Sequence, residues 1–115
     1  MLKLHKEAKE TSLFRVMSVD EYNTLKHNNG LFTEYDFAMS HKWFATSLKH
    51  ALEWKTKLKY PEGGFRIIEI TISQSMLKQM FYVERLDGIG PAYSADIPML
   101  NKIVRRVKYH EDCNS

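Results

Sequence analysis

Three short segments rich in β-branched and aromatic residues constrain what this chain can fold into. They cover residues 13–17, 42–47 and 65–72. Each is shorter than a typical helix and has the composition of a strand. The third is the strongest, because its isoleucines alternate along the segment and would share one face of a strand. We therefore expect a sheet with these segments among its strands.

Helix signals lie between the predicted strands. Ser18 and Glu21 have the spacing of a capping box, in which the serine oxygen accepts a backbone N–H and the glutamate reaches back to the cap. That helix should end at residues 28–30, because Gly30 can adopt the positive φ that helix C-termini often require. A second helix should begin after Thr46 or Ser47, either of which can cap it.

The second half of the chain has shorter elements. We expect a helical turn at 75–80, a strand at 81–86, a glycine-rich loop at 87–91, a helix at 97–102 and a strand at 103–109. The loop contains G-x-G but has no third glycine and no long helix after it, so it is a turn before it is a phosphate loop. Strands separated by single helices, with hairpin-like spacing late in the chain, predict an α+β fold with a mainly antiparallel sheet.

Composition indicates one domain. The chain has 115 residues, a net charge of +3 and one cysteine, Cys113. We expect a flexible arm at 1–11 and a single domain at 12–115, in a reducing compartment such as the cytoplasm. No window reaches the roughly 18 consecutive apolar residues of a membrane span, so we expect a soluble protein without a membrane partner. The histidines lack metal-ligand spacing, and no metal is expected.

Arg15 stands in an otherwise apolar strand. Its guanidinium stays charged when it is desolvated, so it must find an anion or a carboxylate. Two interpretations remain open. Arg15 either binds a ligand or forms a structural ion pair with a carboxylate such as Glu69 or Glu84.

The order of several short motifs resembles a small ADP-ribosyltransferase domain. These motifs are Phe14-Arg15-Val16-Met17-Ser18, Gly30-Leu31-Phe32, Phe44-Ala45-Thr46-Ser47, Ala51-Leu52-Glu53-Trp54 and Ile67-Ile68-Glu69-Ile70. The resemblance covers about residues 12–73. It implies a split, twisted sheet whose cleft binds NAD, which is the substrate of these enzymes.

The resemblance also implies roles for individual residues. Arg15 would donate its forked N–H groups to the pyrophosphate or to the ribose beside it. Thr46 or Ser47 would hold the catalytic carboxylate in one rotamer, although a helix cap explains both hydroxyls fully and is compatible with that role. Three aromatic residues are candidates for a wall against the nicotinamide ring: Phe32, Trp43 and Tyr93.

The catalytic carboxylate is the weakest part of the match, because no paired E-x-E is present. Among Glu84, Glu69 and Glu111 we select Glu84, which follows the third strong strand and precedes the glycine loop. It would hydrogen-bond a ribose hydroxyl and stabilise the positive charge of an oxocarbenium-like state. The competing interpretation is a solvated surface glutamate, and with it a degenerate, inactive member.

Two other classes of function remain open. A basic C-terminal segment suits a metal-independent ribonuclease. Its members are Lys102, Arg105, Arg106, Lys108 and His110. His41 or His50 would then act with Glu69 or Glu84, although adjacent arginines on a strand should point to opposite faces. The third class is a nucleotide- or protein-binding module. A small basic domain also suits a toxin, a phage protein or a defence factor, with a protein or nucleic-acid acceptor and a cognate inhibitor protein as partners.

Overall fold

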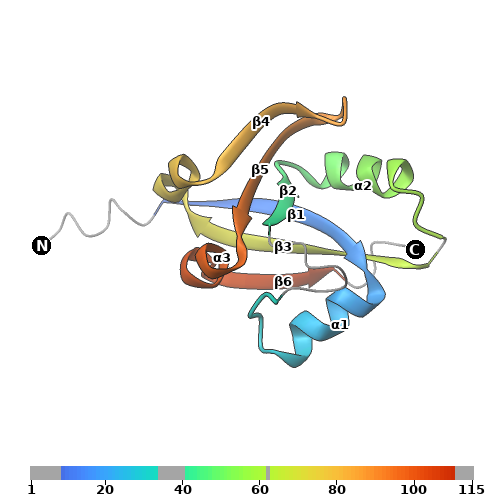
Figure 1. Cartoon of the computed structure of the whole chain (residues 1–115), viewed down its shortest axis with the longest axis horizontal. Helices are drawn as coiled ribbons and strands as arrows, with labels where there is room; N and C mark the ends of the chain where they lie inside the picture. The colour runs from blue at the N-terminus through green and yellow to red at the C-terminus, as the bar shows by residue number, and fades with distance from the viewer. Residues whose placement is uncertain (1–8, 34–40, 62, 111–115) are drawn as a thin grey trace, which may run out of the picture.

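One antiparallel sheet, with its strands in the order β4-β5-β2-β1-β3-β6, organises the chain (Figure 1). It is seen in a computed structural model that describes residues 9–33, 41–61 and 63–110. The elements are β1 (Glu10–Ser18), α1 (Val19–His27), β2 (His41–Ala45), α2 (Leu48–Lys57), β3 (Phe65–Ser73), a 3₁₀ helix (Gln74–Gln79), β4 (Phe81–Leu86), β5 (Gly90–Asp96), α3 (Ile97–Ile103) and β6 (Arg106–His110). The predicted α+β fold with an antiparallel sheet is confirmed.

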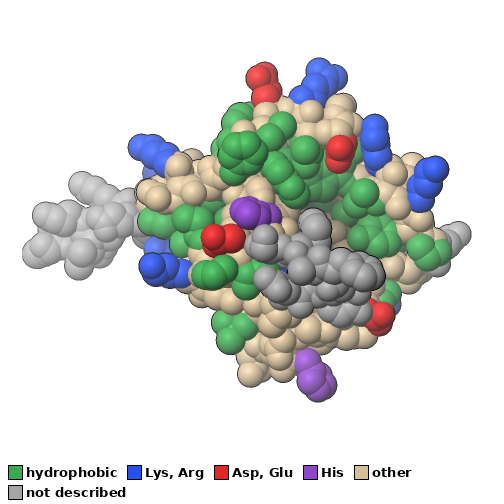
Figure 2. Space-filling model, in the orientation of Figure 1, with side chains coloured by type: hydrophobic (Ala, Val, Ile, Leu, Met, Phe, Trp, Pro, Cys, Tyr) green, Lys and Arg blue, Asp and Glu red, His purple; other side chains and the backbone are tan. Residues whose placement is uncertain are grey.

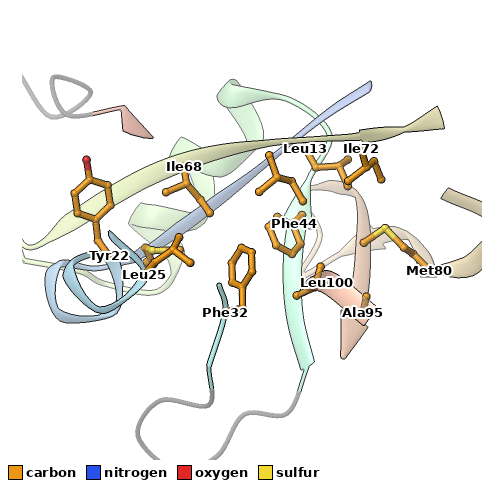
Figure 3. Close-up of a cluster of buried hydrophobic side chains, with 12 residues drawn as sticks. Leu13, Tyr22, Leu25, Phe32, Phe44, Ile68, Ile72, Met80, Ala95 and Leu100 are labelled. Carbon is orange, nitrogen blue, oxygen red and sulfur yellow. The ribbon is translucent and has the colours of Figure 1, made fainter. Parts of the chain in front are cut away.

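The sheet has a hydrophobic cluster on each face. Alternation along β3 sends Ile68, Ile70 and Ile72 to one cluster, which also holds buried residues of α1 and α3. Figure 3 shows these side chains meeting beneath the strands. The opposite alternation sends Phe65 and Ile67 to a second cluster, which α2 covers with residues that include Trp54. We call the two sides of the sheet the α1 face and the α2 face.

The sheet divides between β1 and β2. These two strands are matched only at Phe14 and Ala45, whereas β1 pairs with β3 along its whole length, from Glu10 to Ser18. In Figure 1, β4 and β5 rise across the view while β1, β3 and β6 run horizontally. The two halves of the sheet, β4-β5-β2 and β1-β3-β6, therefore diverge just beyond Phe14.

The predicted helix starts hold, with one difference in each. The Ser18 Oγ accepts the backbone N–H of Glu21 at 3.1 Å, as a capping box requires. The glutamate does not reach back to the cap, because its carboxylate binds other side chains. For α2, Ser47 and not Thr46 is the cap, since its Oγ accepts the N–H of His50 at 3.1 Å. Gly30 has the expected positive φ, +85°.

Two elements predicted in the second half of the chain have different bounds, and one strand was not predicted. The loop expected at 87–91 is a three-residue turn at 87–89, with positive φ at Asp87 and Gly88, and Gly90 already begins β5, the strand that was not predicted. The last strand begins at Arg106 because α3 continues to Ile103. Most of the predicted arm lies outside the described residues, although β1 already begins at Glu10. Cys113 and Glu111 also lie outside them.

Candidate functional site at the split between β1 and β2

Arg15 lies where the two halves of the sheet diverge. Its Nε and Nη2 donate to the two carboxylate oxygens of Glu21 at 3.0 and 3.1 Å. Its Nη1 donates to the backbone carbonyl of Trp43, on the neighbouring strand, at 3.2 Å. The Arg15 side chain is 16% exposed. The guanidinium thus bridges β1, the first turn of α1 and β2 at the point where the β1–β2 ladder has ended.

A buried lysine completes this cluster of charges. The Nζ of Lys42 lies 3.2 Å from the Glu21 carboxylate, and its side chain is 2% exposed. A buried ion pair persists only where hydrogen bonds offset the loss of hydration, and here both cations meet a single carboxylate. We call this arrangement the Arg15–Glu21–Lys42 cluster. Its three side chains carry a net charge of +1.

Glu21 corrects one expectation about Arg15. An ion pair was one of the two open interpretations, with a carboxylate such as Glu69 or Glu84 as the partner. The partner is Glu21, because α1 starts directly after β1 and its first turn folds back over the strand it has just left. The capping-box pattern had already placed Glu21 in that first turn. It was therefore the signal that could have identified the partner.

Tyr60, which the sequence did not single out, has a hydroxyl whose pKa is affected by the charges of the cluster. It packs against the hydrophobic cluster of the α2 face. The pKa of the Tyr60 hydroxyl is raised, mainly because the group is buried. The positive charge of Arg15 opposes this shift, and the negative charge of Glu21 adds to it. Tyr60 therefore lies within electrostatic reach of the cluster.

Tyr93 lies on the same face of the sheet as Arg15. Arg15 alternates with Val16 and so lies on the α1 face, and Phe44 on β2 has its side chain in the cluster of that face. Tyr93 is paired with Phe44 and contacts Tyr82 of β4, with 4.9 Å between the ring centroids. Two strand spacings, about 10 Å, separate the strands of Arg15 and Tyr93. Hydrophobic side chains gather over β4 and β5 on the side seen in Figure 2.

Two other aromatic candidates are not placed to form a wall beside Tyr93. The Trp43 ring lies on the α2 face and contacts Phe81, with 6.0 Å between the ring centroids. Phe32 is 3% exposed and packs edge-on against Phe44, so no face of its ring is open to a ligand. Phe32 is used in packing, and the half-buried Trp43 ring lies on the opposite face of the sheet from Tyr93.

The side chain of Asn101 fixes the backbone of Phe32. Its Oδ1 accepts the Phe32 N–H at 2.7 Å, and its Nδ2 donates to the Phe32 carbonyl at 3.0 Å. This pair of bonds joins the loop after α1 to α3. No local pattern indicates this contact, because 69 positions separate the two residues.

Glu84 does not lie beside Arg15, and the two hydroxyls lie at the end of β2, whose Ala45 pairs with Phe14. Glu84 is exposed on β4, in the irregular part of the β4–β5 pairing, and three strand spacings of about 14 Å separate its strand from β1. Thr46 and Ser47 follow β2 directly, where Ser47 caps α2. The carboxylate in contact with Arg15 is that of Glu21.

The histidine–carboxylate pair of the structure differs from those foreseen for a ribonuclease. His110 lies 3.0 Å from Glu69, through Nε2 and Oε1. Burial raises the pKa of the Glu69 carboxyl, but hydrogen bonds with His110 and Ser12 outweigh it and the pKa is lowered. His41 is instead paired in the sheet with Asp96, and His50 lies against Gly90.

The adjacent arginines also behave differently from the expectation. Arg105 and Arg106 both bind the Glu10 carboxylate, at 3.0 and 2.7 Å, and do not point apart. Strand alternation does not apply to Arg105, because β6 begins only at the next residue. The two guanidinium groups therefore converge.

Within the described residues, no group of three His, Cys, Asp or Glu side chains is placed to hold a metal ion. None of the helices in that part of the chain has the length and apolar character needed to cross a membrane. Comparison with protein-family models, with curated proteins and with solved structures finds no match for this chain.

Proposed function

We propose that this chain is an NAD-dependent ADP-ribosyltransferase-like protein. It would break the bond between nicotinamide and ribose and transfer ADP-ribose to a protein or nucleic acid. The observation that carries the proposal is the position of Arg15, held at the split of a divided sheet by contacts to both β2 and α1. A split sheet with an arginine on its first strand is what the resemblance implies.

The Arg15–Glu21–Lys42 cluster suggests how NAD would be received. A guanidinium recognises phosphate oxygens as it recognises a carboxylate, through two parallel N–H groups. Arg15 now directs Nε and Nη2 at Glu21, so the NAD pyrophosphate would compete with Glu21 for the same donors. Lys42 would keep Glu21 paired when Arg15 turns to the ligand. In this proposal Arg15 releases the Glu21 carboxylate and binds the NAD pyrophosphate in its place.

Cleavage of the nicotinamide bond needs a carboxylate near the positive charge that develops on the ribose. The resemblance assigns this role to Glu84, and the contact with Arg15 makes Glu21 the alternative. Tyr93 lies on the α1 face, on a strand between β4, which carries Glu84, and β1, whose Arg15 binds Glu21. A ring in that position suits stacking on the nicotinamide.

The test is transfer of radiolabelled ADP-ribose from NAD to a protein and RNA extract. Glu84→Gln should abolish transfer and leave NAD binding within twofold, because it removes the stabilising charge and little else. Glu53→Gln, an exposed change on α2, is the matched control. Loss of transfer in the Glu21→Gln variant alone, with binding kept, would move the catalytic role to Glu21. Full transfer in both variants would refute the proposed chemistry.

One observation favours a second candidate function. A metal-independent ribonuclease needs an imidazole and a carboxylate for acid–base catalysis, and the His110–Glu69 pair would supply both. Lys108 lies opposite Glu69 in the sheet. RNA cleavage without NAD, lost in His110→Ala, would support this function over the first. A toxin or effector role with a cognate inhibitor protein extends either proposal, whereas a binding module without turnover would show neither activity.

A further inference from the structure

A second surface, separate from the split, joins two hollows. The larger, of about 1160 Å³, lies between the 3₁₀ helix and α3, with apolar lining from Met76, Met99 and Ile103. The smaller, of about 450 Å³, lies between the end of α1 and β6, with Leu31 and Tyr109 in its lining. Val104 and Arg105 line both hollows, so the two lie side by side. We call this surface the α3–β6 groove.

The cations of the α3–β6 groove are spaced along it. Lys102 lines the larger hollow, Arg105 lies between the two, and Arg106 and Lys26 line the smaller one. Glu10 binds both arginines and is the carboxylate seen among these cations. Among the described residues, these four cations and Glu10 together carry a net charge of +3.

Arg105 and Arg106 have N–H donors that are not used by Glu10 and that can bind a ligand. Each donates one hydrogen bond to Glu10, whereas a guanidinium group has five N–H donors in all. The Arg105 and Arg106 side chains are 43% and 64% exposed. Glu10 thus accepts one hydrogen bond from each guanidinium group and competes with a ligand for these two donors.

Apolar surface alternates with these cations. Leu31 is 53% exposed at the smaller hollow. The Tyr109 ring beside it is held edge-on by Tyr22 and lies 5.4 Å from the Lys26 ammonium. A ligand that fits must therefore carry repeated negative charges with flat apolar groups between them. Single-stranded nucleic acid has this pattern, with phosphates for the cations and bases for the hollows.

We propose that the α3–β6 groove binds single-stranded nucleic acid through its phosphates, with bases resting in the two hollows. This inference goes beyond the proposed function and does not depend on it, because binding is measured without NAD. A mononucleotide would fill one hollow and meet only part of the charge. An acidic peptide would satisfy the cations and leave the apolar lining unused.

The experiment follows the fluorescence anisotropy of a labelled 12-nucleotide oligouridylate, titrated with the full chain at 50 and 200 mM NaCl. For about three phosphate contacts, log K should fall with log salt at a slope near −2, which is roughly a 20-fold loss over this range. The Lys26→Gln/Arg106→Gln variant should bind at least tenfold more weakly, with a slope near −0.7. Lys49→Gln/Lys57→Gln, two exposed changes on α2, is the matched control and should bind within twofold of the parent.

A variant of opposite sign separates a specific site from lost folding. Glu10→Gln removes the competing carboxylate and should tighten binding by at least threefold, a gain that a damaged protein does not show. Three results would overturn the proposal: equal weakening in the α2 control, competition by polyglutamate as strong as by unlabelled RNA, or no binding at 50 mM NaCl up to 100 µM protein. Competition by uridine monophosphate at similar concentrations to the oligonucleotide would also overturn it.

Discussion

Removal of the Glu21 charge should be one of the most destabilising single changes at the split. In Glu21→Gln, the Arg15 and Lys42 side chains keep their positions but lose the carboxylate that both contact within 3.2 Å. Removing one member of a buried ion pair typically costs about 3–5 kcal/mol, because a charge stays buried without compensation. The Glu21 side chain is 15% exposed, so water compensates in part and the lower end, about 3 kcal/mol, is expected.

The measurement is urea unfolding followed by the fluorescence of the two tryptophans, Trp43 and Trp54. A two-state fit gives the free energy of unfolding of the parent, of Glu21→Gln and of the control Glu53→Gln, whose side chain is exposed on α2. The control should change stability by less than about 0.5 kcal/mol. A loss below about 1 kcal/mol in Glu21→Gln, equal to an exposed salt bridge, would refute the assignment of this cluster as a buried structural centre.

Three further changes test other parts of the fold. Asn101→Ala should lower the free energy of unfolding by about 1–3 kcal/mol, because it removes both bonds to the loop after α1, and urea unfolding measures the loss. Gly90→Ala should lower the melting temperature, because an added Cβ would lie 2.6 Å from the His50 ring. His50→Ala in the same chain should restore part of the lost melting temperature. An unchanged melting temperature in Gly90→Ala would contradict the close approach of the His50 ring. The hydrogen bond with His110 helps to lower the pKa of Glu69, so its stabilising contribution is present at neutral pH and is lost as the pH falls below about 4.5. The difference in free energy of unfolding between the parent and Glu69→Gln should therefore shrink from pH 6 to pH 3. A difference that stays constant over this range would count against the Glu69–His110 pair.

Local signals predicted much of the fold because they act over a few residues. Alternation in residues 65–73 specified both faces of β3, and the serine caps specified where α1 and α2 begin. A turn signal precedes β5, the strand that was not predicted. Asp87 and Gly88 favour a tight hairpin turn, which requires a partner strand directly after it. Pro91 and the small residues that follow hid that strand. Pro91 is accommodated because it lies at the start of β5, in the irregular part of the pairing with β4 and before the pairing with β2 begins at Ala92.

The candidate site was less predictable, because it depends on how elements fold over one another. The composition of β1 showed that Arg15 needs a partner, but the choice of Glu21 follows from the direction in which α1 leaves the strand. The choice between Trp43 and Tyr93 as an aromatic wall depends on the register of β2 with β5, which places their rings on opposite faces of the sheet. Neither the fold-back nor the register can be read from residue spacing within one segment.

The most direct test of the central claim follows the Arg15 Nε–H resonance by NMR while NAD is added, with Arg15→Lys used to assign the signal. If Arg15 exchanges Glu21 for the NAD pyrophosphate, this resonance should shift saturably with NAD and stay in place with nicotinamide alone. A resonance that does not move at millimolar NAD would show that the guanidinium remains bound to Glu21, and it would contradict the proposed function.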